Sequence, residues 1–556
     1  FLACENRRKP VNIAIATMAL FMFYYEPLVY IFSLFRLVES YWYRYSYIGN
    51  FVIIYFAACF FSEFDIKKQS VNIVLRSAVG ISGVLLLINY IHDGGNLNEI
   101  YKTVIAYLLI AFLLVLIFQT QRSGNGKKFG QIFLAGCLAC VVMIDLGYNN
   151  YKLIESYKIS LVKQYKKYVE KEEKLIDALK QYDSGFYRIS QTSTRHMMEG
   201  NLTANYNESV AFDYNSITGY TSVPEFSQLQ FMKNLGYQEH GKSMSIVNTS
   251  ILSADALLGV KYILSDEAIE GLSLAEDLPQ ANGKSIYMNP YVLPNAFVFS
   301  GRPGRLGETG NPFVFQNELY SQLAGRNVKI FKPLSFSTEI QESNIKYIVA
   351  VPETASVLYG NLPTAINLDA DLYINGQFRT AYSQWLSPSV FYIPCNTAND
   401  VNVEIALVRD GVGNLVENVY PQFYYLDLEV LGDIVNELRM KEAKNIDIMP
   451  GIVQGTVNGN DGEYLYLNIP YHSQWKIFRN GKTIVPEQLG GCLITIPLEG
   501  GINEIEAKYE VSGWKLGVAI SGIAILIFII YLKKKQKEGD NGKSWKKVID
   551  CDASIQ

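Results

Sequence analysis

Residues 103–119, TVIAYLLIAFLLVLIFQ, form an unbroken run without a charged side chain, and this run decides the class of fold. A helix needs about 20 predominantly apolar residues to cross the hydrocarbon core of a bilayer. Together with its flanking residues this stretch meets that length. Five other predominantly apolar stretches predict further transmembrane helices at 11–32, 46–62, 71–91, 129–148 and 514–532. The sequence therefore predicts a polytopic α-helical membrane domain.

The overall composition fits a membrane protein with a large water-exposed part. The chain has 556 residues, of which 49% are hydrophobic, so one soluble domain does not account for it. The formal net charge is −4 and no basic stripe follows the aromatic residues, which argues against a nucleic-acid-binding protein. Residues 150–512 instead have the sequence pattern of a soluble globular region, because their apolar residues occur in short runs between charged and polar ones.

Four clusters of basic residues predict the topology. Lys and Arg collect on the cytoplasmic side of membrane proteins. If every predicted helix crosses the bilayer, all four clusters lie on one side and residues 150–512 lie outside the cytoplasm. In that compartment Cys395 and Cys492 could form a disulfide, although the sequence does not show that they are close. The clusters are Arg7, Arg8 and Lys9; Lys67 and Lys68; Arg122, Lys127 and Lys128; and Lys533, Lys534, Lys535 and Lys537.

The part outside the membrane divides by pattern into an α+β or mainly β region and a small β-sandwich. Alternating runs such as YLYLNI (464–469) predict strands, and Asn480-Gly481 predicts a tight hairpin turn between two of them. The predicted domains are a membrane domain at 1–149 with five helices, an amphipathic connecting helix at 150–183, an extracytoplasmic α+β domain at 184–431, a β-sandwich at 432–512, a transmembrane helix at 513–533 and a basic cytoplasmic tail at 534–556.

Candidate site residues lie in the predicted outer loop at 33–47. Arg36, Glu39, Trp42 and Arg44 would sit at the membrane interface, where a guanidinium could bind a lipid-linked phosphate and an aromatic face could contact the lipid or a sugar ring. The alternative is an ordinary interfacial belt of aromatic and basic residues.

Two ionisable residues within the predicted helices are also candidates, because such residues are often functional. Glu26 precedes Pro27 and Asp145 lies near one end of its predicted helix, so either could instead mark the interface. The four histidines show no HxxxH or HExxH spacing, no CxxC pair of the metal-binding type occurs, and no phosphate-binding glycine loop of the GxxxxGK[ST] type occurs.

The segments outside the membrane resemble the bacterial YfhO membrane-protein family over about residues 130–535. The resemblance rests on the order and spacing of six pieces: FYRIS (186–190), GYTSV with FMKNLGY (219–237), SADALLGVKYILS (253–265), NPYVLPNAFV (289–298), NPFVFQNEL (311–319) and IPYHSQWKIFRNGKTI (469–484).

This resemblance implies a GT-C-type glycosyltransferase that takes a sugar from an undecaprenyl-phosphate carrier and adds it to an envelope polymer such as lipoteichoic acid. It also implies a catalytic carboxylate in the first outer loop, acting as a base or through a divalent metal. We expect that loop upstream of Phe1, so the chain is expected to be an N-terminally truncated piece without its catalytic residue.

Two other classes of function remain open at this point. A non-catalytic membrane protein could bind an envelope polymer through the tyrosine-rich outer domain, since tyrosine rings stack on sugars. A transporter or flippase would need polar residues near the midplane and broken helices, and the predicted helices are mostly uninterrupted.

Overall fold

The computed structural model describes most of the chain, in two compact units, Phe1–Ile159 and Ser160–Gln556. We call them the helical unit and the β-rich unit. The described residues are 9–33, 45–63, 71–93, 100–122, 128–156, 162–192, 207–221, 224–240, 244–246, 249–307, 310–340, 344–353, 357–363, 370–382, 390–394, 401–407 and 421–552.

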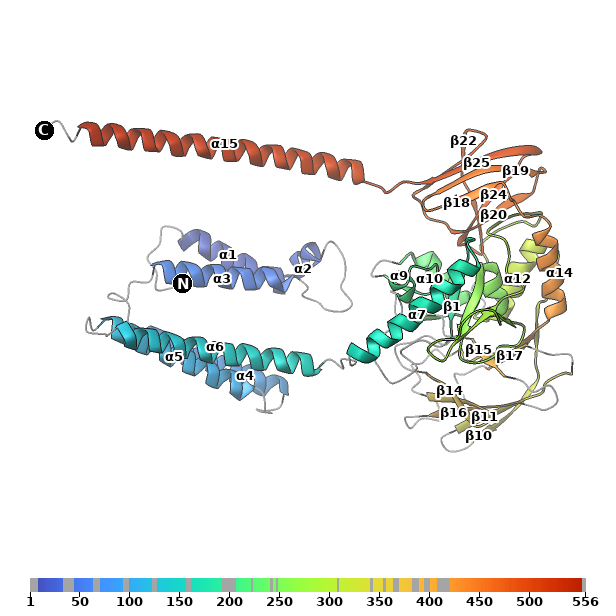
Figure 1. The fold of residues 1–556 in the computed structure, drawn as a ribbon, viewed down its shortest axis with the longest axis horizontal. Coiled ribbons are helices and arrows are strands. Elements are labelled where there is room, and N and C mark those ends of the chain that lie inside the picture. The colour runs from blue at the N-terminus through green and yellow to red at the C-terminus, as the bar shows by residue number, and fades with distance from the viewer. Residues whose placement is uncertain are drawn as a thin grey trace. The chain divides into compact units, whose positions relative to one another are not determined.

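The described part of the helical unit consists of helices. This is expected for segments in lipid, because backbone N–H and C=O groups there find no water and must form their hydrogen bonds within the helix. Helix α5 packs against both α4 and α6, and α1 packs against α3 (Figure 1). Tyr45 contributes to the second contact, because its hydroxyl donates to the carbonyl of Met22 at 2.8 Å. The helices are α1 (Lys9–Tyr24), α2 (Glu26–Phe32), α3 (Ser46–Glu63), α4 (Val71–Asp93), α5 (Ile100–Arg122) and α6 (Lys128–Ser156).

Three helices in the described residues are long and apolar enough to cross a membrane: Ile100–Thr120, Lys128–Glu155 and Trp514–Lys535. The apolar parts of α3 and α4, Ser46–Cys59 and Leu75–Ile91, are shorter. All six predicted stretches are thus helical, while the count of six crossings and their orientation stay predictions.

The stretch predicted as a transmembrane helix at 11–32 consists of two helices rather than one. The chain breaks at Tyr25 and turns by 88° between Pro10–Phe23 and Glu26–Phe32. Pro27 lies in the first turn of α2, where its missing N–H is tolerated and where it would interrupt a continuous helix. The two helices together would count as a fourth candidate span.

The last helix, α15 (Trp514–Asp552), is longer than the stretch predicted to cross the membrane. Its apolar part ends at Lys535, and the helix continues through the lysine-rich segment predicted as a cytoplasmic tail. Side-chain exposure is high along the whole apolar part, as for a helix whose partner is lipid.

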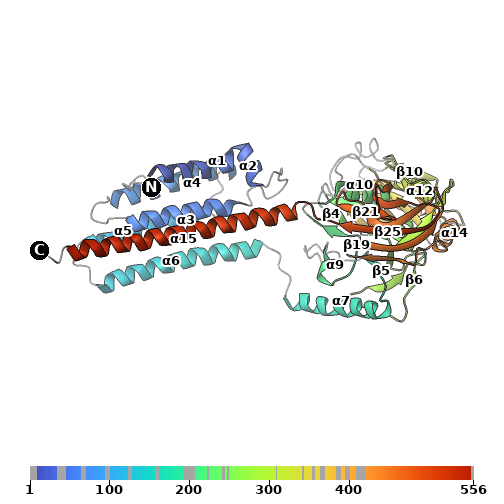
Figure 2. The same cartoon turned by 90° about the horizontal axis from the view of Figure 1, so that it is seen from above.

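The β-rich unit contains several small sheets with short helices beside them (Figure 2). In its described residues the strand orders are β1-β5-β7-β6, β2-β4-β3, β15-β12-β17-β9, β10-β11-β16-β13-β14, β18-β19-β25-β21-β22 and β23-β24-β20-β8. The largest apolar core lies under α10, α11, α12 and α14. The helices are α7 (Val162–Tyr182), α9 (Glu208–Ala211), α10 (Phe226–Leu235), α11 (Leu252–Leu257), α12 (Pro312–Ala324) and α14 (Leu428–Arg439).

The strands of the first half are β1 (Arg188–Gln191), β2 (Gly219–Tyr220), β3 (Gln238–His240), β4 (Met244–Ile246), β5 (Val260–Ser265), β6 (Ser273–Leu274), β7 (Ser285–Met288), β8 (Ala296–Phe299), β9 (Phe331–Pro333), β10 (Phe336–Ile340), β11 (Asn344–Val349) and β12 (Val357–Asn361). Those of the second half are β13 (Ala370–Ile374), β14 (Gln377–Tyr382), β15 (Phe391–Ile393), β16 (Val401–Leu407), β17 (Gln422–Leu426), β18 (Ile446–Met449), β19 (Ile452–Gly459), β20 (Tyr464–Pro470), β21 (Trp475–Arg479), β22 (Lys482–Ile484), β23 (Glu487–Leu489), β24 (Leu493–Pro497) and β25 (Gly501–Tyr509).

The C-terminal strands form two sheets that share one apolar core, as in a β-sandwich. The predicted hairpin is confirmed: β21 pairs with β22, and Asn480 and Gly481 have φ of 51° and 73°. One strand comes from outside the predicted range, because β8 pairs with β20. Local sequence pattern does not reveal such a long-range pairing.

The stretch predicted as a connecting helix, 150–183, is divided between the end of α6 and α7. Helix α7 is an integral part of the β-rich unit, because its apolar side chains Leu175, Ile176 and Leu179 are buried against β1, β5 and β7. Glu172 on the same helix is also fully buried and pairs with Lys284 at 2.6 Å.

Gly301, which follows β8, gives a stability prediction. A Cβ at this position would lie 1.5 Å from the carbonyl oxygen of Gln322 at the end of α12, so Gly301→Ala must push the two segments apart. We expect a loss of about 1–3 kcal/mol, measured as a lower thermal midpoint of the full-length protein in detergent. Gly307→Ala is the control, because a Cβ there meets nothing within 4 Å. Equal midpoints for the two variants would contradict the prediction.

Candidate functional site

The residues proposed from the sequence as membrane-side site residues are not brought together in the described structure. Arg36, Glu39, Trp42 and Arg44 lie outside the described residues. Glu26 is exposed in the first turn of α2. Asp145 is half-buried on α6, and no ion pair to it is found in the described part of the chain.

The cysteine prediction likewise stays a prediction. Cys492 is a free, buried thiol, and Cys395 lies outside the described residues. No group of three or more His, Cys, Asp or Glu side chains that could hold a metal occurs within the described ranges.

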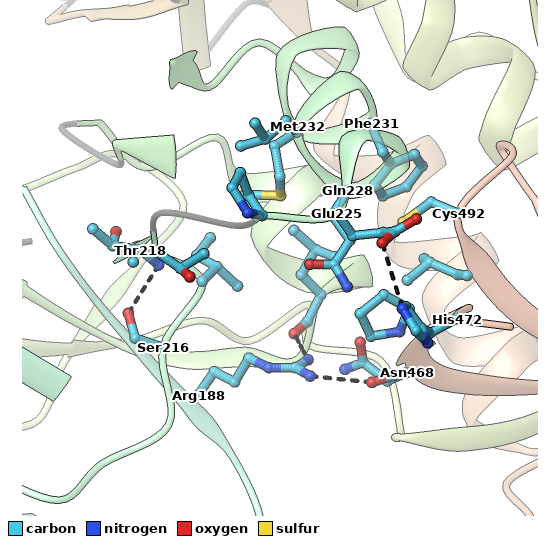
Figure 3. A pocket seen from close by; sticks show the side chains of 18 of the residues that line it. Arg188, Ser216, Thr218, Glu225, Gln228, Phe231, Met232, Asn468, His472 and Cys492 are labelled. Atoms are coloured by element: carbon cyan, nitrogen blue, oxygen red, sulfur yellow. Dashed lines mark hydrogen bonds and ion pairs between the residues drawn. The ribbon is translucent and has the colours of Figure 1, made fainter. Parts of the chain in front are cut away.

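A cavity of about 510 Å³ lies inside the β-rich unit and is the candidate functional site (Figure 3). Its volume is within the range of small-molecule sites. Its walls come from four places in the chain: β1, the segment that runs into α10, the end of α11, and the β-sandwich. The lining residues are Arg188, Ser216, Ile217, Thr218, Gly219, Tyr220, Thr221, Pro224, Glu225, Gln228, Leu229, Phe231, Met232, Leu258, Asn468, Pro470, His472, Cys492, Leu493 and Tyr509.

Arg188 supplies the positive charge of this pocket. Its Nη1 donates to the carbonyl of Leu258 at 2.5 Å and its Nη2 to the carbonyl of Asn468 at 3.1 Å. No carboxylate of the described residues forms an ion pair with it. Burial lowers the pKa of the guanidinium, but arginine stays charged at any physiological pH. The pocket therefore contains a permanent charge whose described partners are neutral.

The surroundings of Arg188 allow a close approach of three segments. Gly259 has a φ of 68°, and a Cβ there would lie 2.5 Å from Nδ2 of Asn468 and 2.9 Å from Oδ1 of Asn295. The absence of a side chain lets Asn468 donate to Asn295 at 3.0 Å. Oδ1 of Asn468 is buried and accepts no hydrogen bond in the part of the chain that is described. A ligand with a donor group could satisfy it.

A second polar group lies at another part of the pocket wall. Glu225 is 3.5 Å from Nε2 of His472, and Figure 3 shows the two side chains facing each other. Nδ1 of His472 accepts a hydrogen bond from the backbone N–H of Gln474 at 3.2 Å. The ring of Tyr509 lies 5.6 Å from that of His472. This group offers a carboxylate and an aromatic face, which is a combination suited to hydroxylated ligands.

The remaining wall near Cys492 is uncharged. Burial raises the pKa of its thiol to about 12, so the sulfur stays protonated and acts as a small apolar group. Phe231 and Met232 of α10 add further apolar surface.

Pocket residues come from four of the sequence pieces on which the family resemblance rests. Arg188 belongs to FYRIS, Gly219 to GYTSV, Leu258 to SADALLGVKYILS and His472 to IPYHSQWKIFRNGKTI. The sequence predicted the pieces but not that they meet, because their proximity depends on tertiary contacts. An arginine inside a strand-like apolar context, as in FYRIS, is the local signal that could have drawn attention to Arg188.

The comparisons with known proteins agree with the sequence resemblance. A family model described as "Bacterial membrane protein YfhO" matches residues 2–521. The uncharacterized protein YfhO of Bacillus subtilis (strain 168) is 24% identical over 113 residues, which cover 20% of this chain and 13% of that protein.

Matches to solved structures are weak. An anti-sigma factor domain-containing protein has a TM-score of 0.11 and 9% identity, over 32% of this chain and 82% of that chain. A salicylate 1,2-dioxygenase from Pseudaminobacter salicylatoxidans has a TM-score of 0.08 and 8% identity, over 38% of this chain and 76% of that one. Neither carries an argument about fold.

Proposed function

The chain belongs to the YfhO family of bacterial membrane proteins, and from this premise we propose that it is a membrane glycosyltransferase. The proposed reaction transfers a sugar from an undecaprenyl-phosphate carrier to a cell-envelope polymer of the lipoteichoic-acid type. The observation that carries the proposal is the extent of the family match, which runs through the helical unit and almost to the end of the β-rich unit.

The division of the chain into two units supports this proposal. A lipid-linked donor needs a membrane-embedded part, and the helical unit has helices long and apolar enough for that role. A polymeric acceptor needs a water-exposed part with a binding surface, and the β-rich unit contains a pocket with charged, polar and aromatic walls. In the proposed orientation the β-rich unit lies outside the cytoplasm, as the basic clusters predict.

Arg36 and Arg44 remain our candidates for binding the carrier phosphate. We expect Arg36→Ala and Arg44→Ala in the full-length protein each to lower kcat/KM for sugar transfer by about tenfold or more, because a charge-assisted contact to phosphate is lost. The measurement is transfer of labelled sugar from the lipid carrier to polymer. Arg326→Ala is the control, since Arg326 is exposed and its described contacts are a surface pair with Glu437 and a bond to the carbonyl of Ala324. Unchanged transfer in both loop variants would refute this assignment.

The proposal as a whole is tested in cells. Deleting the gene should remove a sugar substituent from an envelope polymer, detectable by NMR of the isolated polymer, and the intact gene should restore it. The competing function is a non-catalytic polymer-binding membrane protein. Unchanged sugar content in the deletion strain, together with polymer binding by the purified protein, would favour that function instead.

A further inference from the structure

We propose that the pocket around Arg188 binds a phosphodiester that links hydroxylated groups, such as a polyol phosphate or sugar phosphate. The inference deepens the proposed function, because it would make the pocket the subsite that holds the phosphate-containing substrate. Two sources could supply this chemistry: the backbone of an acceptor polymer, or the phosphate head of the lipid-linked donor.

The charge of the pocket is the first argument. Arg188 is the only Lys or Arg among the described lining residues, its two described hydrogen-bond partners are backbone carbonyls, and its one described ring contact is with the uncharged Phe186. A buried positive charge without a counter-charge is unfavourable, and an anion that enters the pocket relieves this cost. Glu225 contacts His472 instead, and no ion pair between Glu225 and Arg188 is found among the described residues. A phosphodiester carries one negative charge and so matches the single arginine.

The remaining hydrogen-bonding capacity is the second argument. A guanidinium has five N–H donors, and Arg188 uses two of them in bonds to Leu258 and Asn468. The others are available to phosphate oxygens, for which the planar fork of arginine is well suited. The side chain of Asn468 is nearly fully buried, with 2% of the residue exposed, and its Oδ1 has no hydrogen-bond partner in the described structure. This oxygen can accept a hydrogen bond from a ligand hydroxyl beside the phosphate.

The rest of the pocket is the third argument. A phosphodiester has an organic group on each side, and the pocket has walls suited to such groups. Glu225 can accept hydrogen bonds from hydroxyls, and Tyr509 offers an aromatic face beside His472. A simple anion site would need neither feature. The cavity of about 510 Å³ also exceeds what one phosphate ion requires.

The test measures binding to the purified full-length protein in detergent by isothermal titration calorimetry. The probes are a short glycerol phosphate oligomer, a polyprenyl-phosphate-linked sugar, inorganic phosphate and glycerol. Arg188→Met should weaken binding of whichever phosphodiester probe binds the wild-type protein by tenfold or more. Glu225→Gln, at an exposed position, should lower the affinity for the oligomer severalfold and leave the affinity for inorganic phosphate unchanged.

A matched control separates binding from folding. Arg439 also donates to backbone carbonyls, those of Pro290 and Val292, and burial also lowers the pKa of its guanidinium, but it does not line the pocket. Arg439→Met should therefore lower thermal stability to a similar degree and leave probe binding intact. If Arg188→Met itself does not fold, Glu225→Gln still tests the site.

The outcomes are distinct. Arg188-dependent binding of the oligomer assigns the pocket to the acceptor, and Arg188-dependent binding of the lipid-linked probe assigns it to the donor. Equal affinities of the Arg188→Met and Arg439→Met proteins, or no phosphodiester binding by the wild-type protein, would overturn the inference. Arg188-dependent binding without any sugar transfer would leave the pocket assignment standing and refute the glycosyltransferase. Sugar transfer that is unaffected by Arg188→Met would refute the pocket as a substrate site and leave the glycosyltransferase proposal standing.

Discussion

Replacement of Lys284 by methionine is expected to destabilise the β-rich unit by about 3–5 kcal/mol. Lys284 and Glu172 are both completely buried, and the ammonium lies 2.6 Å from one carboxylate oxygen. Lys284 also donates to Gln191 at 2.7 Å, and Asn282 donates to the other oxygen of Glu172 at 2.8 Å. Without the lysine, Glu172 is a buried charge with no cation beside it. The thermal midpoint of the full-length protein in detergent should fall by about 10 °C.

The double variant Glu172→Leu with Lys284→Met is the control for this prediction. Removing both charges takes away the buried carboxylate of Glu172 that the single variant leaves without a cation, so the double variant should recover part of the lost stability. Full recovery is not expected, because Lys284 also donates to Gln191, and because burial raises the pKa of Glu208 while the charge of Lys284 acts to lower it. Hydrogen exchange in peptides covering 168–182 should be fastest in Lys284→Met, slower in the double variant and slowest in the wild-type protein, because this contact connects α7 to the residue directly before β7. A single variant as stable as the double variant would show that the pair contributes little.

Asp255 is expected to make the β-rich unit less stable as the pH rises. Burial raises the pKa of its carboxyl from 3.8 to about 7, against hydrogen bonds from Ser250 and Tyr237 that favour the charged form. Between these two pKa values the folded protein holds a proton that the unfolded chain has lost. The free energy of unfolding should therefore decrease by about 4 kcal/mol from pH 4 to pH 7 on account of this group and level off above that range.

Asp255→Asn should remove this contribution, because asparagine stays neutral at every pH. Thermal midpoints of the full-length protein between pH 5 and pH 8 should fall less steeply in this variant than in the wild-type protein. Asp427→Asn is the control, because the pKa of Asp427 is lowered from 3.8 and lies below this pH range, so the variant should keep the wild-type slope between pH 5 and pH 8. Burial alone would raise the pKa of Asp427, but bonds from Lys332 and the N–H of Val430 lower it, so its stabilising effect is lost as the pH falls. If the thermal midpoint of Asp255→Asn falls with pH as steeply as that of the wild-type protein, the prediction is contradicted.

Local patterns predicted the elements of this fold better than their partners. The apolar stretch at 103–119 appears within α5, and Asn480-Gly481 appears as the predicted hairpin turn, because both depend on neighbouring residues only. The break at Tyr25 could have been predicted from the sequence, since Pro27 follows it closely and proline interrupts helices. The pairing of β8 with β20 was not, because no local feature connects strands so far apart in the chain.

The candidate site illustrates the same limit. The pieces FYRIS and IPYHS, which contain Arg188 and His472, stood out in the sequence, but nothing in either piece shows that these two residues line one cavity. Gly259, whose missing side chain makes room for Asn468, is one of the tertiary features that the sequence did not reveal. The loop with Arg36 and Arg44 was selected by composition, and its role rests on the activity measurements proposed above.

The pairing of β8 with β20 also has a consequence for biosynthesis. Strand β8 is made about 165 residues before β20, its one strand partner in the described residues, so no strand pairs with it until Tyr464–Pro470 has been synthesised. The second sheet is complete only with β25, directly before α15 begins. Contacts of such long range form slowly and leave intermediates prone to aggregation. Chains that end before residue 509 should therefore depend strongly on chaperones.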